Sequence, residues 1–287
     1  MAWTFHAPLP APDDGPAGWR AWAAAVVAGV AADLADDRGD VRTAGGAATP
    51  PDGHFHHMPE CFLQLDGRRR FRLPGAETVL APGEALLIPP LLRHHEAVIG
   101  RDPGVNLVLS VQTGWLSVHA GRVVRGTLQP HGAQAVPAPG HALGDGCLRC
   151  AAAAADDAGR RLWLRAFLDW AGATLREAPL PAPGRHARVG RALALVQYEL
   201  GRSDLGVAFL ARTLGCTPGH LTRQFREDLG EAPLAYIRRA RLERARDLLR
   251  DHGLPVAAAA RLVGIRDAAY FSRIYRARFG APPSATR

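Results

Sequence analysis

The spacing of apolar positions changes several times along the chain. From Trp19 to Leu34 an Ala-rich run follows helical spacing. From His54 to about Thr127 the apolar residues fall in short segments separated by Asp-Gly, Pro-Gly and Pro-Pro pairs, which is typical of an antiparallel barrel or sandwich. Residues 128–144 read as a loop, and the chain after residue 186 reads as helix. This pattern predicts an α+β fold with two domains.

Helical spacing returns between Asp157 and Glu177. This helix carries one broad apolar stripe, made up of Leu162, Trp163, Ala166, Phe167, Trp170 and Leu175. The stripe fits either a contact between two copies of the chain or packing against the chain's own barrel. A Pro-rich run that begins at Ala178 marks a domain boundary. We therefore expect an N-terminal domain at 1–177 with its barrel at about 50–127, a linker at 178–186 and a C-terminal domain at 187–287.

The C-terminal segment contains an internal repeat. Residues 211–215 recur at 260–264, shifted by 49 positions, and residues 221–230 recur at 271–280, shifted by 50. Each copy reads as a helix, a glycine-containing turn and a second helix, which is the layout of a helix-turn-helix motif. Gly215 and Gly264 supply the backbone conformation that such a turn requires.

The second helix of each copy has a recognisable start. Thr217 caps the first with Pro218 at its first helical position, and Asp267 caps the second. Arg223 and Arg273 occupy matching outward positions, and arginine suits a bidentate contact with guanine. An ion pair with Glu227 or Asp228 is the alternative for Arg223. The candidate DNA-contacting residues are Gly219, His220, Thr222, Arg223, Arg226, Ala268, Ala269, Ser272, Arg273 and Arg276.

A long helix and an uneven charge distribution support DNA binding. The helix expected at Pro233–Arg250 would separate the two recognition helices by about one turn of B-DNA. The chain contains no lysine and has a net charge of +8. Residues 186–287 hold 18 Arg against 9 acidic residues, whereas residues 1–185 hold 17 Arg against 18. The basic excess therefore belongs to the C-terminal third, as expected of a nucleic-acid module.

Cysteine usage indicates a reducing compartment, and hydropathy indicates a chain without a membrane segment. Four cysteines are too few for a disulfide framework in 287 residues, and Cys147 and Cys150 form a single C-x-x-C without a second pair. The longest apolar run, Ala21 to Ala32, is too short to span a bilayer and lacks the basic flank of a signal peptide. We therefore expect a cytoplasmic protein without a membrane segment.

Residues of about 187–287 resemble the DNA-binding domain of the AraC/XylS family of bacterial regulators. The matching positions are Leu210-Ala211, Leu221-x-Arg223-x-Phe225, Gly230-x-x-Pro233, Tyr236-Ile237, Arg241-Leu242, Ala245, Tyr270-Phe271-Ser272-Arg273-x-Tyr275, Gly280-x-Pro282 and Arg287. Ile265 departs from the usual Phe, and Ala268 and Ala269 replace polar base-reading residues. The resemblance implies sequence-specific binding to double-stranded DNA, with RNA polymerase as a further partner.

Histidines in the predicted barrel resemble the two motifs of the cupin superfamily. His54-x-His56-x-x-x-Glu60 is followed by Gly67, and Gly83-x5-Pro89 leads to His94. The resemblance implies a site of three His and one Glu for a divalent metal such as Zn, Fe, Ni or Mn. The alternative is that His54, His56, Glu60, Gln64 and His94 line an effector pocket without metal. Leu91 and Val98 depart from the motif, and His57 and His95 are expected to lie outside the cluster.

Together these features favour a transcription regulator that responds to a small-molecule effector and acts as a homodimer. We expect it not to be an enzyme. The alternative is a metal-dependent cupin oxygenase or isomerase fused to a DNA-binding module. A repair protein with an AraC-type module is disfavoured, because its methyl-accepting and zinc-binding cysteines are not evident. The effector, the operator sequence and the choice between activation and repression stay open.

Overall fold

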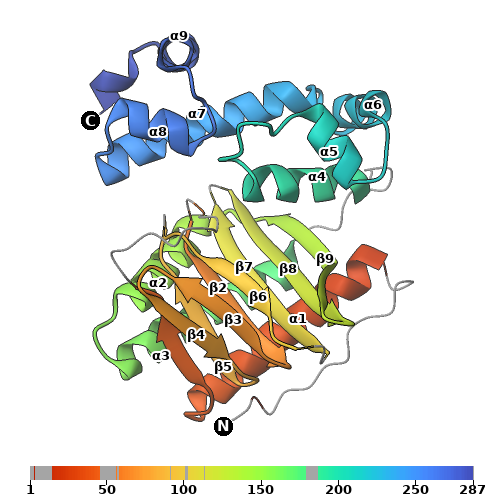
Figure 1. Cartoon of the computed structure of the whole chain (residues 1–287), viewed down its shortest axis with the longest axis vertical. Coiled ribbons are helices and arrows are strands. Elements are labelled where there is room, and N and C mark those ends of the chain that lie inside the picture. Colours follow the sequence, from red (N-terminus) through yellow and green to blue (C-terminus); the bar gives the residue numbers. More distant parts are fainter. Residues whose placement is uncertain are drawn as a thin grey trace. The chain divides into compact units, whose positions relative to one another are not determined.

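The computed structural model describes residue 3, residues 15–45, residue 56, and residues 58–90, 92–100, 103–112, 114–178 and 187–286. The chain divides into two compact units, Met1–Leu180 and Pro181–Arg287 (Figure 1). The first contains two β-sheets with helices, and the second is helical. The predicted two-part α+β class is therefore confirmed. Among the described residues, no helix is both long and apolar enough to cross a membrane.

Two β-sheets form the centre of the N-terminal unit. The larger has the order β1-β5-β2-β7-β8-β9 and the smaller the order β4-β3-β6. Only β1 and β5 pair in parallel; the other described pairs are antiparallel. The strands are β1 (Asp40–Thr43), β2 (Glu60–Asp66), β3 (Arg69–Leu73), β4 (Ala76–Leu80), β5 (Glu84–Ile88), β6 (His95–Val98), β7 (Gly104–Gln112), β8 (Trp115–Val124) and β9 (Thr127–Pro137).

Alternation along the strands produces two apolar cores. On β2, Cys61 and Leu63 pack with the helices, whereas Phe62 belongs to a second cluster with Phe71 of β3. The Phe62 and Phe71 rings meet edge to face with centroids 4.9 Å apart. Because side chains alternate between faces, Glu60 and Gln64 share the side of Phe62 and lie between the two sheets, whereas Asp66, beyond a register shift, is exposed. This parity places Glu60 and Gln64 in the interior.

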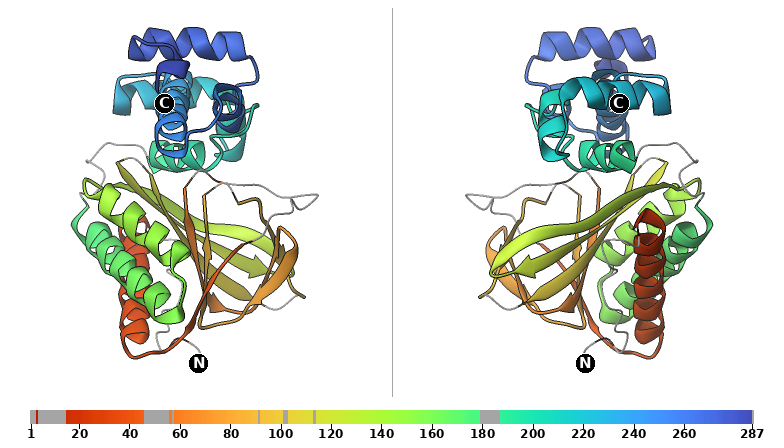
Figure 2. Two further views of the ribbon diagram at one scale, coloured as in Figure 1. Left: turned by 90° about the vertical axis from the view of Figure 1, so that its left-hand side faces the viewer. Right: turned by 90° about the vertical axis from the view of Figure 1, so that its right-hand side faces the viewer.

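Helices α1 (Gly15–Ala35), α2 (His141–Ala153) and α3 (Asp157–Glu177) cover one face of the larger sheet (Figure 2). The predicted bounds of α3 agree with the structure, but its predicted apolar stripe is partly wrong. Leu162 and Trp163 are 63% and 40% exposed. The buried face instead comprises Leu164, Phe167, Leu168, Ala171, Gly172 and Leu175. This face packs against α1 and α2, so the chain's own unit covers it.

Two further expectations were wrong in this unit. Residues 128–144 form β9 and the start of α2 rather than a loop. Proline and glycine suggested turns, but β9 is an edge strand, where a missing N–H need not break a ladder. The structure also adds β1, so the strands extend from residue 40 to residue 137, beyond the predicted 50–127. Strand β1 has only four residues, too few for a clear alternation.

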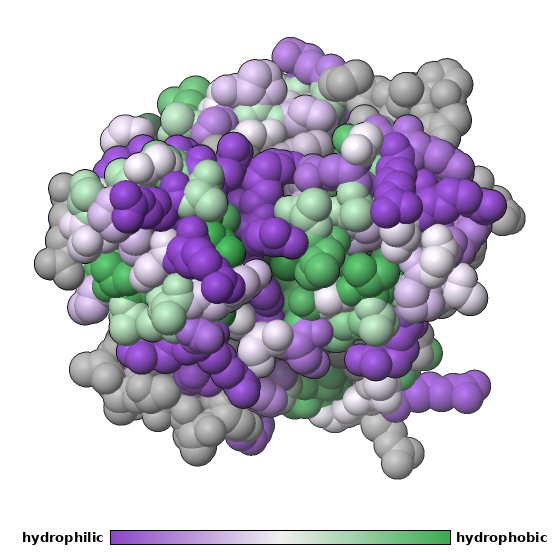
Figure 3. All heavy atoms as spheres, turned by 90° about the horizontal axis from the view of Figure 1, so that it is seen from above, coloured by the Kyte–Doolittle hydropathy of each residue, from purple (hydrophilic) through white to green (hydrophobic). Residues whose placement is uncertain are grey.

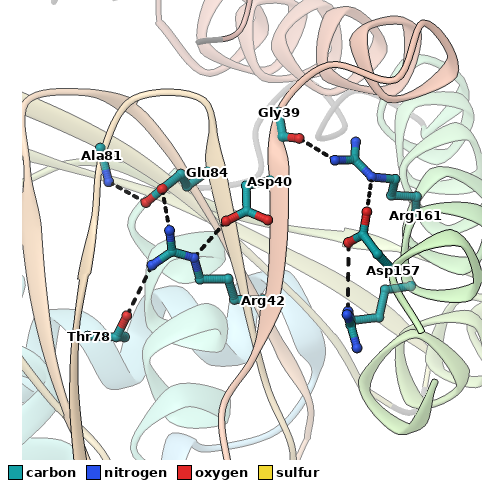
Figure 4. Close-up of polar contacts among 9 residues, drawn as sticks. Gly39, Asp40, Arg42, Thr78, Ala81, Glu84, Asp157 and Arg161 are labelled. Atoms are coloured by element: carbon teal, nitrogen blue, oxygen red, sulfur yellow. Dashed lines mark hydrogen bonds and ion pairs between the residues drawn. The ribbon is translucent and has the colours of Figure 1, made fainter. Parts of the chain in front are cut away.

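Arginine side chains attach β1 and the preceding turn to their surroundings (Figure 4). Arg42 of β1 donates to Asp40 at 2.7 Å and to Thr78 of β4 at 3.4 Å, which links the two sheets. Arg161 of α3 pairs with Asp157 at 2.6 Å and donates to the carbonyl oxygen of Gly39. These contacts join the first turn of α3 to the segment that enters β1.

The C-terminal unit contains two helix-turn-helix motifs joined by a long helix. Its helices are α4 (Ala187–Tyr198), α5 (Val207–Thr213), α6 (Pro218–Leu229), α7 (Pro233–His252), α8 (Val256–Leu262) and α9 (Ala268–Phe279), followed by a 3-10 helix (Pro283–Thr286). Gly215 and Gly264 have φ values of +64° and +76°, as predicted for the two turns. Helix α7 extends two residues beyond its predicted end.

Candidate nucleic-acid interface and interior polar cluster

The first recognition helix, α6, presents a polar face because its apolar side chains point inward. Thr217 caps it by accepting from the backbone N–H of His220 at 3.2 Å, and Pro218 opens it. Leu221 and Phe225 are fully buried. The predicted contact residues Gly219, His220, Thr222, Arg223 and Arg226 are all exposed or half-buried. The helix therefore offers these positions to a partner without disturbing its core.

Arg223 is in contact with an acidic neighbour, the alternative that the sequence left open. Its Nε lies 3.8 Å from Oε1 of Glu227, and the two side chains are 66% and 51% exposed. An exposed ion pair contributes at most about 1 kcal/mol. A phosphate or a base edge can therefore replace Glu227 at low cost, and the ion pair in the free protein does not exclude a DNA contact.

The second recognition helix, α9, begins in the same way with a different cap. Asp267 accepts from the backbone N–H groups of Ala269 and Tyr270, both at 2.9 Å. Phe271 and Tyr275 are buried. All five predicted DNA-contacting residues of this helix are exposed or half-buried: Ala268, Ala269, Ser272, Arg273 and Arg276.

Tyr270 is an outward-facing residue that the predicted contact set omitted. It is 38% exposed and corresponds to His220 in the first copy. The Arg273 guanidinium lies 5.5 Å from the centroid of its ring. The 50-residue offset of the repeat was a signal that could have identified it. The face of the molecule in Figure 3 combines hydrophilic residues with smaller hydrophobic areas.

Some arginines of α7 are used inside the unit. Arg241 donates from Nε to the carbonyl oxygen of Leu200 at 3.3 Å and from Nη2 to that of Arg202. Burial lowers its pKa. Arg239 pairs with Glu231 at 2.6 Å and lies over the ring of Tyr236. Part of the basic excess in this third of the chain therefore has a structural role. The support for DNA binding comes mainly from the two recognition helices.

A buried histidine–glutamate cluster lies in the N-terminal unit. Oε2 of Glu60 is 3.6 Å from Nε2 of His56 and 3.4 Å from Nε2 of His94. All three side chains are at most 5% exposed, and one potential ligand atom from each lies within 4.8 Å of the others. The structure thus brings together three of the four predicted ligands among the residues that it describes. His54, the fourth, lies outside the described residues.

The second nitrogen of His94 has a partner that suits metal binding. Its Nδ1 lies 3.1 Å from the carbonyl oxygen of Leu92. A hydrogen on Nδ1 would be donated there, which leaves the Nε2 lone pair directed to Glu60. Burial, and then Glu96, raise the pKa of Glu60 well above its ordinary range. A divalent cation would reverse this effect and favour the carboxylate. The donor set therefore fits a divalent metal.

Further polar groups lie between the sheets, and most of them were not predicted from the sequence. Arg69 is fully buried, with Nη1 3.5 Å from Glu96 and Nη2 3.3 Å from Asn106. Burial raises the pKa of Glu96 to about 7, against the opposing effect of Arg69. Gln64, which was predicted, donates to the carbonyl oxygen of Asp66 at 2.7 Å. Strand parity with Phe71 could have identified Arg69, whereas Glu96 and Asn106 lie on other strands. The space between the sheets is therefore lined by polar as well as apolar side chains.

Comparisons with known proteins concern the C-terminal part of the chain. A family model described as "Helix-turn-helix domain" matches residues 210–287. The Arabinose operon regulatory protein of Escherichia coli (strain K12) is 32% identical over 105 residues, which cover 37% of this chain and 36% of that protein. HTH-type transcriptional regulator CdhR of Pseudomonas aeruginosa is 41% identical over 78 residues, covering 27% and 23%. The chain thus spans about a third or less of the length of these relatives.

Solved structures match the same part. The C-terminal domain of AraT, a response regulator from Geobacillus stearothermophilus, covers 37% of this chain and 87% of that chain at 28% identity, with a TM-score of 0.35. The family model spans both copies of the repeat, and its description agrees with the two helix-turn-helix motifs described above. Residues 210–287 therefore form an AraC-type helix-turn-helix domain.

Proposed function

We propose that the protein is a sequence-specific DNA-binding transcription regulator that responds to a small-molecule effector. The observation that carries this proposal is the pair of recognition helices with Arg223 and Arg273 exposed at corresponding positions. Contacts with bases would come from α6 and α9, and contacts with phosphates from the surrounding arginines. Regulation of transcription makes RNA polymerase a partner and the cytoplasm the place of action.

Selection of duplexes from a randomised library by the full chain tests this function. We expect a recovered consensus and an affinity that falls steeply with added salt. Replacing Arg223 and Arg273 together by Ala should abolish the consensus, whereas Arg72→Ala, which removes an exposed charge from β3, should leave it intact. A library that stays random after selection, or an affinity insensitive to salt, would refute the function.

The interior of the N-terminal unit supports effector binding. Glu60 and Gln64 of β2, Arg69 of β3 and Asn106 of β7 are at most 2% exposed and lie between the two sheets. Buried polar groups of this kind fix the orientation of small ligands. Metabolites would be screened by the shift they cause in the melting of the full chain. Gln64→Leu should abolish the melting shift caused by a ligand that binds between the sheets and leave unchanged the shift caused by a ligand that binds to the surface.

The cluster of His56, Glu60 and His94, with His54, is proposed to hold one divalent metal. When bound, the metal would supply Lewis acidity or serve as part of the effector site. Zinc added alone should raise the melting temperature of the full chain, and Glu60→Gln should abolish this shift. Gln64→Asn, on the same face of β2, is the matched control. Turnover of a substrate by the metal-loaded chain would instead favour the alternative, a metal-dependent enzyme fused to a DNA-binding module.

A homodimer is proposed through the exposed apolar residues of the N-terminal unit. Leu162 and Trp163 of α3 and Leu143 of α2 are 63%, 40% and 62% exposed, although large apolar side chains are normally buried. A second copy is the proposed occupant, since a homodimer places the same apolar residues on both sides of a two-fold interface. Sedimentation of the full chain at several concentrations tests this, and a monomer at all of them would refute it.

A further inference from the structure

His220 lies between two guanidinium groups at the start of the first recognition helix. Nη1 of Arg188, in α4, is 2.9 Å from Nε2 of His220 and 3.1 Å from Oε1 of Gln224. On the other side of the ring, Nη2 of Arg223 is 3.1 Å from Nδ1. Both ring nitrogens of His220 are therefore within hydrogen-bond distance of an arginine.

Only one of these two contacts can be a hydrogen bond. A guanidinium group donates and never accepts, and it stays protonated in proteins. A neutral imidazole has a lone pair on one nitrogen and a hydrogen on the other, and a protonated imidazole has no lone pair. The two arginines therefore compete for a single acceptor.

Arg188 is the better placed of the two competitors. Its contact is shorter, and the same Nη1 group also donates to Gln224, which is 5% exposed. Arg223 is 66% exposed and has Glu227 as another partner. The hydrogen bond from Arg188 thus takes the lone pair of Nε2, which leaves the hydrogen on Nδ1.

We propose that Arg188 is a positioning residue that holds His220 in the tautomer with its hydrogen on Nδ1. His220 and Arg223 then present two neighbouring donors to DNA. This inference rests on the proposed function. Two donors match the N7 and O6 acceptors of guanine, whereas the amino groups of adenine and cytosine would face a donor. The first turn of a recognition helix is where base contacts concentrate, so His220 selects guanine there.

The second copy is built differently at the corresponding positions. Tyr270 replaces His220, and Ile274, which has no hydrogen-bond acceptor in its side chain, replaces Gln224. The guanine preference therefore belongs to the half of the DNA site that contacts the first copy.

Nitrogen NMR of the full chain with labelled histidine tests the tautomer directly. His220→Asn identifies the signals of His220. We expect the hydrogen on Nδ1 in the native protein, its transfer mainly to Nε2 in Arg188→Met, and its return to Nδ1 in Arg188→Lys, which keeps a donor. A hydrogen on Nε2 in the native protein would overturn the inference, whether or not DNA binds.

Binding to duplexes recovered from the randomised library tests the consequence. In His220→Ala, one position of the duplex should no longer affect the affinity when its base is changed, and this position identifies the base that His220 contacts. Arg188→Met should reduce the preference for guanine there by about tenfold. Arg238→Met, which removes an exposed arginine charge from α7, should not. If Arg188→Met retains the preference, the inference is wrong although the regulator function stands. If the library yields no consensus, the proposed function itself fails.

Discussion

Gly215 and Gly264 provide a matched pair for a stability prediction. They occupy the same turn in the two copies, with φ values of +64° and +76°. A Cβ added at Gly215 would meet nothing within 4 Å. At Gly264 it would lie 2.8 Å from the carbonyl oxygen of Arg202 and 2.8 Å from Nη2 of Arg241. The two substitutions by alanine therefore share the backbone cost and differ in the contacts they force.

The size of each effect follows from these surroundings. A left-handed backbone costs alanine about 1–2 kcal/mol, and that is the expected loss of unfolding free energy for Gly215→Ala. Gly264→Ala has the same cost and in addition displaces the Arg241 guanidinium from its backbone acceptors. Hydrogen bonds to charged groups contribute about 1.5–3 kcal/mol. The total for Gly264→Ala is therefore about 2.5–5 kcal/mol.

Intrinsic fluorescence of the full chain separates the two units during denaturant unfolding. All six tryptophans lie at or before residue 170, and all four tyrosines lie after residue 197. The tyrosine transition should shift strongly in Gly264→Ala and weakly in Gly215→Ala, and the tryptophan transition should stay in place in both. Losses that agree within about 0.5 kcal/mol would refute the argument, because the backbone conformation alone would then explain them.

Three further predictions address DNA binding, pH and assembly. Arg223→Ala should cost about 1–3 kcal/mol on the selected duplex if it contacts a base, and an equal loss on random DNA in a fluorescence titration would show a phosphate contact instead. Burial lowers the pKa of His119 to about 4 from 6.5, so the folded state binds its proton less readily than the unfolded state. Stability is therefore lost as the pH falls from 6.5 through 4, by about 1–2 kcal/mol because His119 as a whole is only half-buried. The tryptophan transition should follow this slope, and a variant His119→Gln with the same slope would contradict the assignment. Leu162→Asp should turn the proposed dimer into a monomer in sedimentation without shifting the tryptophan transition, since this side chain is exposed in the single chain. Leu164→Asp, on the buried face of α3, should instead unfold the unit.

Local signals were sufficient for the C-terminal unit. Its repeat, its caps at Thr217 and Asp267 and its turns at Gly215 and Gly264 are properties of short stretches of chain, and helix-turn-helix motifs are built from such stretches. The capping groups and the positive φ angles agree with the predictions, because cap and turn chemistry acts within a few residues.

Contacts between distant segments decided the rest. The cluster of His56, Glu60 and His94 and the contact of Arg69 with Asn106 join residues that are far apart in the sequence, so the local pattern could not give their partners. Leu162 looked like part of an apolar face until the packing of α1 and α2 against α3 showed which face is covered. The same holds for His220, whose tautomer depends on Arg188, a residue 32 positions earlier. The sequence by itself thus determined the helices, the turns and the family of the C-terminal part. Tertiary packing alone decided which polar groups meet, because such contacts depend on how separate elements are brought together.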